Sequence, residues 1–255
     1  LCAPLNHPKI KLMKTRMNRL ALVAGFIVAA LLSAGCQSPK QNPATISFAA
    51  PPTKESQTAM TPARALAELK AGNARFVSGH PLHRHFAADV KTTASGQYPF
   101  AIVLSCVDSR QPVEIVLDQG IGDIFSARVA GNVLNDDILG SMEFACKISG
   151  AKLIAVIGHS NCGAIKGAID DAQLSHLTGL LAKIKPAISA VPDDGAPRTS
   201  KNSEFVNEVA AANVRLVMRQ IRERSPVLRE MLDAGKIGLV GGMYDLSTGE
   251  VHFFK

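Results

Sequence analysis

Residue types that bind metal ions follow two apolar segments of the chain. The segment 100–105 leads into Cys106, and the segment 152–158 leads into His159 and Cys162. Two thiolates and one imidazole form a borderline-soft ligand set that suits Zn²⁺, and three protein ligands leave the fourth tetrahedral position open. Water bound at such a position has its pKa lowered to about 7, which supplies a hydroxide nucleophile at neutral pH. The pattern therefore predicts catalytic zinc and a small electrophilic substrate.

The elements that must position these ligands are buried strands. Strand patterns occupy residues 100–105, 123–129, 152–158, 236–244 and 251–254, and helical patterns occupy residues 61–79, 135–150, 173–190, 203–223 and 225–235. This alternation predicts an α/β fold, with a mainly parallel β-sheet flanked by helices, an N-terminal helical arm and an added C-terminal strand. The carboxyl ends of neighbouring strands lie only about 5 Å apart, so we expect Cys106, His159 and Cys162 to converge there on one ion.

An acidic and a basic residue, Asp108 and Arg110, follow Cys106 within four positions. An exposed ion pair of this kind is worth less than about 1 kcal/mol and often has no function. Beside metal ligands, however, Arg110 can hold the carboxylate ionised through charge-assisted hydrogen bonds and aim it at metal-bound water. We interpret the pair as a catalytic dyad.

The two motifs together, Cys106-x-Asp108-x-Arg110 and His159-x-x-Cys162, resemble those of the β-class carbonic anhydrases. The similarity runs over residues 61–254 and includes Asp118-Gln119-Gly120, the segment 128–132 and Tyr244-Asp245-x-x-Thr248-Gly249. It implies reversible hydration of carbon dioxide to bicarbonate and a proton, with one Zn²⁺ per chain held by Cys106, His159 and Cys162. In some family members the Asp of the dyad also ligates the metal, which would make Asp108 a fourth ligand in a closed, inactive state.

The resemblance also implies a substrate pocket and an assembly. The family places a Gln and a Phe in its pocket, and Gln97 and Phe125 occupy the matching positions. The family's usual unit is a homodimer, or a dimer of dimers, with these residues near the subunit boundary. One subgroup binds bicarbonate as an effector through a Trp, and the absence of Trp from this sequence disfavours that form of regulation.

Several alternatives use the same residues. A zinc-activated water can also attack carbonyl sulfide or carbon disulfide, and a zinc site without catalysis would fit a structural lipoprotein. In an exported protein, Cys106 and Cys162 could instead form a disulfide. A thiol-redox role is disfavoured, because the chain has no Cys-x-x-Cys.

The remaining candidate groups are interpreted as structural. Three histidines, His80, His83 and His85, have no neighbouring thiol or acid to complete a metal set, so we expect a solvated loop. Cys146 falls within a helical pattern and is expected to be a small buried hydrophobe. The arginines of the 203–223 helix are expected on a solvated or subunit-contact face.

The excess positive charge belongs mostly to the N-terminal part. The chain has 28 Lys and Arg against 21 Asp and Glu, and five of these bases but no acid lie within residues 1–35. The near-neutral remainder argues against a nucleic-acid partner, which needs a concentrated basic face.

Residues 20–32 are apolar, follow a basic stretch and precede Ser33-Ala34-Gly35-Cys36. This run is shorter than the roughly 20 residues of a membrane-spanning helix and fits a secretory signal. Its end resembles the bacterial lipoprotein box, which implies acylation of Cys36. We expect a signal peptide over residues 1–36, a flexible tether over residues 37–60 and the zinc domain over residues 61–255. The protein would then be anchored by lipid on the periplasmic side of a bacterial membrane. Met13 and Met17 are more natural translation starts than Leu1, so residues 1–12 are given no function.

Overall fold

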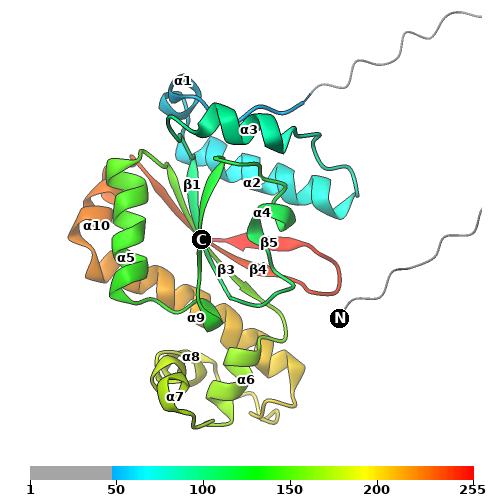
Figure 1. Cartoon of the computed structure of the whole chain (residues 1–255). Helices are drawn as coiled ribbons and strands as arrows, with labels where there is room; N and C mark the ends of the chain where they lie inside the picture. Colours follow the sequence, from blue (N-terminus) through cyan, green and yellow to red (C-terminus); the bar gives the residue numbers. More distant parts are fainter. Residues whose placement is uncertain (1–47) are drawn as a thin grey trace, which may run out of the picture. The chain divides into compact units, whose positions relative to one another are not determined.

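The computed structural model describes residues 48–255, and a five-stranded sheet runs through this part of the chain (Figure 1). Its strands are β1 (Ala101–Ser105), β2 (Ile124–Arg128), β3 (Leu153–His159), β4 (Gly238–Tyr244) and β5 (Val251–Phe254), in the spatial order β2-β1-β3-β4-β5. Strands β1 to β4 pair in parallel, and β5 is antiparallel to β4. The predicted mainly parallel sheet with an added C-terminal strand is thereby confirmed.

Helices precede the first strand, connect the parallel strands and cover both faces of the sheet. They are α1 (Lys54–Thr58), α2 (Pro62–Val77), α3 (Phe86–Thr93), α4 (Val113–Val116), α5 (Asp136–Glu143), α6 (Gly163–Ile169), α7 (Ser175–Ala182), α8 (Lys185–Ala190), α9 (Ser203–Arg224) and α10 (Pro226–Asp233). A 3₁₀ turn, η1 (Ala130–Asn132), follows β2, and a π-helical turn, η2 (Phe144–Ile148), extends α5.

The core has two layers because the inner strands are apolar on both faces. On one face Val103, Ala155 and Ile157 pack against α2 and α4. On the other face Leu104 and Val156 pack against α5, α9 and α10. Every residue of β1 and β3 is buried, as expected for central parallel strands. A third apolar cluster joins α6, α7, α8 and α9 to the carboxyl end of the sheet, which is where the predicted ligands lie.

Helix boundaries differ from the sequence predictions in two places. The single helix predicted over residues 173–190 is two helices, α7 and α8, because Pro186 has no N–H to continue the first and instead starts the second. The helix that begins after Asn135 ends in η2.

The folded domain begins before residue 61, the predicted boundary. Thr53 and Ser56 cap α1 through reciprocal hydrogen bonds. The buried Gln57 amide donates to the carbonyls of Pro99 and Ser149, each at 2.8 Å. Residues 53–60 therefore belong to the domain and not to the predicted tether. The predicted signal peptide with Cys36, and residues 37–47 of the tether, lie outside the described residues. Within residues 48–255, none of the helices has both the length and the apolar character needed to cross a membrane.

Candidate metal centre

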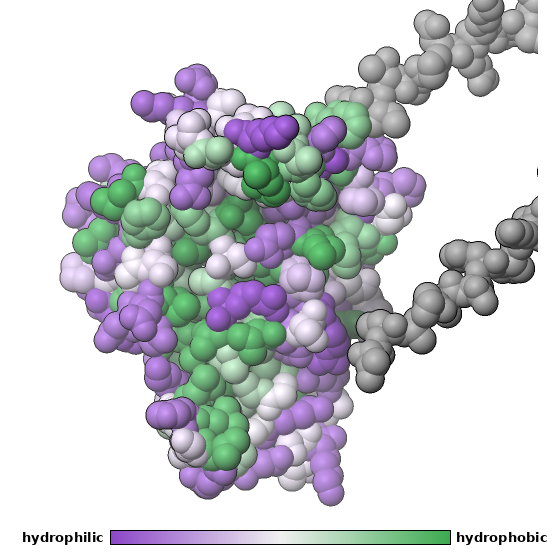
Figure 2. Space-filling model, viewed as in Figure 1, coloured by the Kyte–Doolittle hydropathy of each residue, from purple (hydrophilic) through white to green (hydrophobic). Residues whose placement is uncertain are grey.

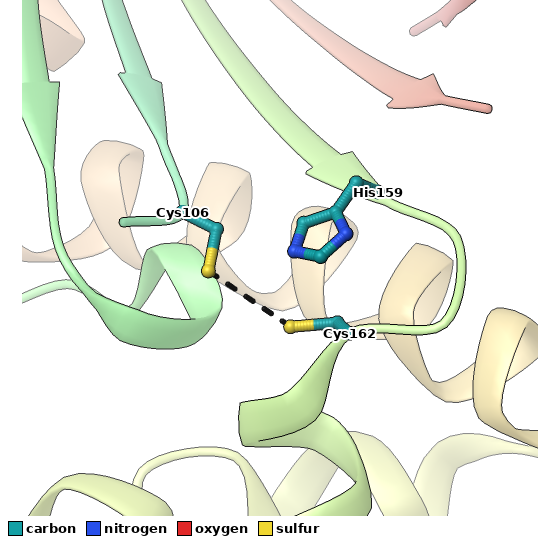
Figure 3. Close-up of side chains that lie close together, drawn as sticks. All are labelled: Cys106, His159 and Cys162. Atoms are coloured by element: carbon teal, nitrogen blue, oxygen red, sulfur yellow. Dashed lines mark hydrogen bonds between the residues drawn. The ribbon is translucent and has the colours of Figure 1, made fainter. Parts of the chain in front are cut away.

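The carboxyl end of the sheet brings Cys106, His159 and Cys162 together (Figure 3). Cys106 directly follows β1, His159 is the last residue of β3, and Cys162 is the N-cap of α6. Their ligating atoms all lie within 4.8 Å of one another, and all three residues are buried. Among the described residues, this is the one group of three or more metal-binding side chains so placed.

The histidine ring is oriented as a metal ligand. Its Nδ1 lies 2.9 Å from the carbonyl oxygen of Ser160, and a carbonyl only accepts, so Nδ1 carries the proton. The other nitrogen, Nε2, is buried and has no hydrogen-bond partner in the described part of the chain. An unpartnered buried lone pair is costly unless something binds it. The donor set of this nitrogen and two sulfurs fits Zn²⁺.

The two thiols are coupled to each other. Their sulfurs are 4.0 Å apart, about twice the length of a disulfide bond, and both cysteines are free, which opposes the disulfide alternative. A hydrogen bond from the Cys162 thiol lowers the pKa of Cys106, and sharing that proton raises the pKa of Cys162. Both sulfurs can be thiolates together only if a cation neutralises them, so metal binding would release a proton.

The turn that carries the last two ligands is held from both sides. Asn161 has a left-handed backbone with φ of 53°, a conformation that asparagine tolerates better than most residues. Its N–H donates to the side chain of Asn207 on α9 at 2.9 Å, and the N–H of Ser160 donates to the carbonyl of Tyr244 at 2.9 Å. The chain between His159 and Cys162 is thereby fixed before any metal binds.

Asp108 and Arg110 form the predicted pair beside this group. The guanidinium donates to both carboxylate oxygens, from Nε at 2.9 Å and from Nη2 at 2.7 Å. These bonds hold the pKa of Asp108 well below its usual range. Its Oδ2 lies 3.8 Å from Nε2 of His159, so the carboxylate borders the ligand group, although Asp108 does not belong to that group.

One residue to which sequence reasoning gave no role, although it lies in the matched segment 128–132, anchors this loop. Arg128, the last residue of β2, donates from Nε to the carbonyl of Cys106 at 3.0 Å and from Nη2 to the carbonyl of Asp108 at 2.6 Å. The parallel register pairs Arg128 with Ser105, which places the guanidinium beside the end of β1. A charged residue at the end of an apolar strand is the signal that would have found it.

The two predicted pocket residues lie elsewhere in the chain. Gln97 is exposed and precedes β1, whereas Cys106 follows the same strand. Phe125 pairs with Ile102, four residues before Cys106, or about 13 Å along an extended strand. Within one chain the structure does not bring either residue to the metal group. Phe125 instead stacks edge-on against Phe144, with ring centroids 6.1 Å apart.

The groups interpreted as structural are placed as follows. His80, His83 and His85 are exposed, and Nδ1 of His85 caps α3. Cys146 is buried in η2, and burial raises the pKa of its thiol to about 12. Arg215 stacks over Phe254 at 4.1 Å. Each of these groups has a structural partner or faces solvent.

Comparison with known proteins agrees with this geometry. The model of the family described as "Carbonic anhydrase" matches residues 101–251. The carbonic anhydrase of Mycolicibacterium smegmatis is 36% identical over 196 residues, which cover 74% of this chain and 92% of that protein.

Solved structures share the fold. The β-carbonic anhydrase CcaA superposes with a TM-score of 0.61 at 23% identity, over 74% of this chain and 95% of that one. A tetrameric β-carbonic anhydrase from Sordaria macrospora superposes with a TM-score of 0.56 at 23% identity, over 66% of this chain and 90% of that one.

Proposed function

The chain belongs to the β-class carbonic anhydrases, and from that membership we propose that it hydrates carbon dioxide with a zinc ion held by Cys106, His159 and Cys162. The observation that carries the proposal is the convergence of two thiols and the unpartnered Nε2 of a buried histidine. When bound, zinc supplies Lewis acidity that makes water a nucleophile at neutral pH.

The protein groups around this position divide the remaining work. His159 is held in one tautomer by the carbonyl of Ser160, so that Nε2 always faces the two sulfurs. The Oδ2 of Asp108 borders the same position and accepts a hydrogen bond from the attacking water, which orients the lone pair of that water toward the substrate carbon. Arg110 keeps this carboxylate ionised and aimed, which favours an open ligand position over closure by Asp108.

The substrate pocket needs a second copy of the chain. Gln97 and Phe125 lie at the opposite end of β1 from Cys106, so we propose that they reach the metal group of a partner protomer in a dimer or a dimer of dimers. Strand β2 is an edge strand of the sheet, and exposed large apolar side chains occur at Phe144, which stacks on Phe125 of β2, and at Ile148 in the same π-helical turn. The face shown in Figure 2 exposes apolar areas among polar ones, as a surface that contacts a second protomer would.

Metal analysis combined with a stopped-flow assay tests this function on the purified full-length protein. We expect about one zinc per chain, rapid hydration of carbon dioxide, loss of both on treatment with a chelator, and recovery of both when zinc is returned. Light scattering on the same sample should give a dimer or tetramer. A metal-free protein, or a zinc-loaded one that releases sulfide from carbonyl sulfide but leaves carbon dioxide unchanged, would contradict the proposal.

We also propose that the enzyme is exported and anchored by lipid at Cys36, on the strength of the apolar run and the small residues before that cysteine. In bacteria that express the full chain, radiolabelled palmitate should enter the wild-type protein and be absent from Cys36→Ser. Labelling that is equal in the two proteins would rule out this anchor.

A further inference from the structure

A buried asparagine interrupts the apolar face of α9. Asn213 is 1% exposed, and the buried residues around it on the helix, Val209, Ala210, Val214 and Val217, are all apolar. Its Oδ1 has no partner in the described part of the chain. A half-satisfied amide in an apolar layer is costly, and a leucine of similar volume would avoid that cost. The position therefore calls for an explanation beyond packing.

The other atom of this amide is linked to the metal centre through one residue, Gly131, whose C=O and N–H belong to successive peptide units. The Nδ2 of Asn213 donates to the carbonyl oxygen of Gly131 at 2.8 Å. The N–H of Gly131 in turn donates to Sγ of Cys106 at 3.3 Å. Helix α9 is thus connected to a predicted zinc ligand by two consecutive hydrogen bonds.

Gly131 lies in a tightly packed turn, η1, to which Asn213 donates a hydrogen bond. Its backbone is left-handed, with φ of 65°, and a Cβ atom added there would lie 2.7 Å from Cδ1 of Ile184. Asn132 follows with φ of 43°. Glycine adopts this conformation without cost and asparagine at a small one, and the contact from Asn213 helps to hold the turn.

We propose that Asn213 is a positioning residue that aims the N–H of Gly131 at the Cys106 sulfur and thereby sets the strength of this sulfur as a zinc ligand. The inference rests on the proposed zinc site. A hydrogen bond to a thiolate fixes its direction and withdraws electron density from it, and partners of this kind typically change metal affinity by about 10- to 100-fold. Without Asn213, the peptide unit after Gly131 loses its hydrogen-bond donor, and the resulting shift of Gly131 weakens the hydrogen bond from its N–H to the sulfur.

Zinc affinity and the absorption spectrum of the cobalt-substituted full-length protein test this inference. In Asn213→Leu we expect zinc to bind about 10- to 100-fold more weakly in competition with a chelator, because the loss of the fixed direction of the sulfur outweighs the electron density that it regains. The sulfur-to-cobalt charge-transfer band should shift to lower energy, because a thiolate without its hydrogen bond gives up an electron more easily. Asn213→Ala, which is smaller and also lacks the donor, should show the same shift if the leucine variant does not fold.

Val217→Ala is the matched control, because Val217 lies one turn further along the buried face of α9 and packs in a different cluster from Cys106 and Cys162. It should lower thermal stability and leave zinc affinity and the cobalt band unchanged. The inference is overturned if Asn213→Leu binds zinc like the wild type, or if Val217→Ala weakens zinc equally. A wild-type protein that binds no zinc would overturn the proposed function itself, which is a distinguishable result.

Discussion

Replacing Cys162 with alanine should leave a folded protein that holds almost no zinc and has lost nearly all hydration of carbon dioxide. Structural zinc sites with four ligands bind with about 10–16 kcal/mol, so one ligand is worth roughly 3–4 kcal/mol, or about 10²- to 10³-fold in affinity. The remaining pair, Cys106 and His159, would then compete poorly with water and buffer. Metal analysis and stopped-flow assays on the same preparation measure both effects.

Thermal unfolding gives an independent view of the same variant. Zinc that binds the native state alone stabilises it by about 4 kcal/mol at a thousandfold excess over its Kd. The wild type should therefore melt at a higher temperature with zinc than with a chelator, whereas Cys162→Ala should melt at one temperature in both. Cys162 is 1% exposed, so the substitution itself also leaves a small cavity, and the chelated proteins supply the correct reference.

Cys146→Ala is the matched control for this experiment. Cys146 is buried as deeply, but it lies in η2, and burial raises the pKa of its thiol to about 12, which makes it an inert small hydrophobe. This variant should keep both zinc and turnover. Full zinc occupancy in Cys162→Ala would show that the metal, if present, is held by other groups.

The sheet and the ligand group could be predicted from the sequence for one physical reason. Strands buried on both faces must be apolar throughout, so residues 100–105 and 152–158 stand out, and parallel strands must end at the same edge. Any metal-binding residues at those ends have to meet. The convergence of Cys106 and His159 follows from this without knowledge of the packing.

The charge of Arg128 at a strand end marks it as a candidate, but the partners of the supporting residues could not be predicted, because they depend on register and packing. The contact of Arg128 with the loop after Cys106 exists because Arg128 pairs with Ser105 and not with a neighbour. The bond from Asn213 to Gly131 joins residues that are 82 positions apart. Nothing in the helical pattern of residues 203–223 indicates which buried position faces that turn.

Two further differences between the sequence predictions and the structure arise from the assembly of protomers and from misleading composition. The resemblance places Phe125 in the substrate pocket, but one chain holds it about a strand's length from Cys106, so the pocket is a property of more than one protomer. Residues 53–60 have the polar composition of a tether and directly follow two prolines. They are nevertheless ordered, because Thr53 caps α1 and Gln57 bonds to two distant carbonyls.

Asp108→Asn should retain zinc but slow the hydration of carbon dioxide by about 10²- to 10⁴-fold, the usual contribution of a positioned acid or base. Zinc remains because Asp108 lies outside the ligand group. Turnover falls because the amide carries no charge and turns an N–H toward either Arg110 or the attacking water, where the carboxylate accepts from both. Stopped-flow rates divided by measured zinc content give the effect on kcat directly. Asp245→Asn, a nearby carboxylate whose Oδ1 only accepts from Ser247, is the control and should remain active.

The pH dependence of the hydration activity separates the role of Arg110 from that of Asp108. The hydrogen bonds from Arg110 are the largest cause of the lowered pKa of Asp108, so the carboxylate stays ionised as the pH falls through the ordinary range of carboxyl groups. In Arg110→Ala this pKa should rise toward its usual value, so activity in mildly acidic buffer should be lost at a higher pH than in the wild type. Without the hydrogen bonds from Arg110, the carboxylate can also turn toward the zinc ion and close the open ligand position, which lowers activity further. If Arg110→Ala and the wild type share one pH profile of activity, the pair does not act through ionisation of Asp108. Full turnover in zinc-loaded Asp108→Asn would show that the carboxylate takes no part in the reaction.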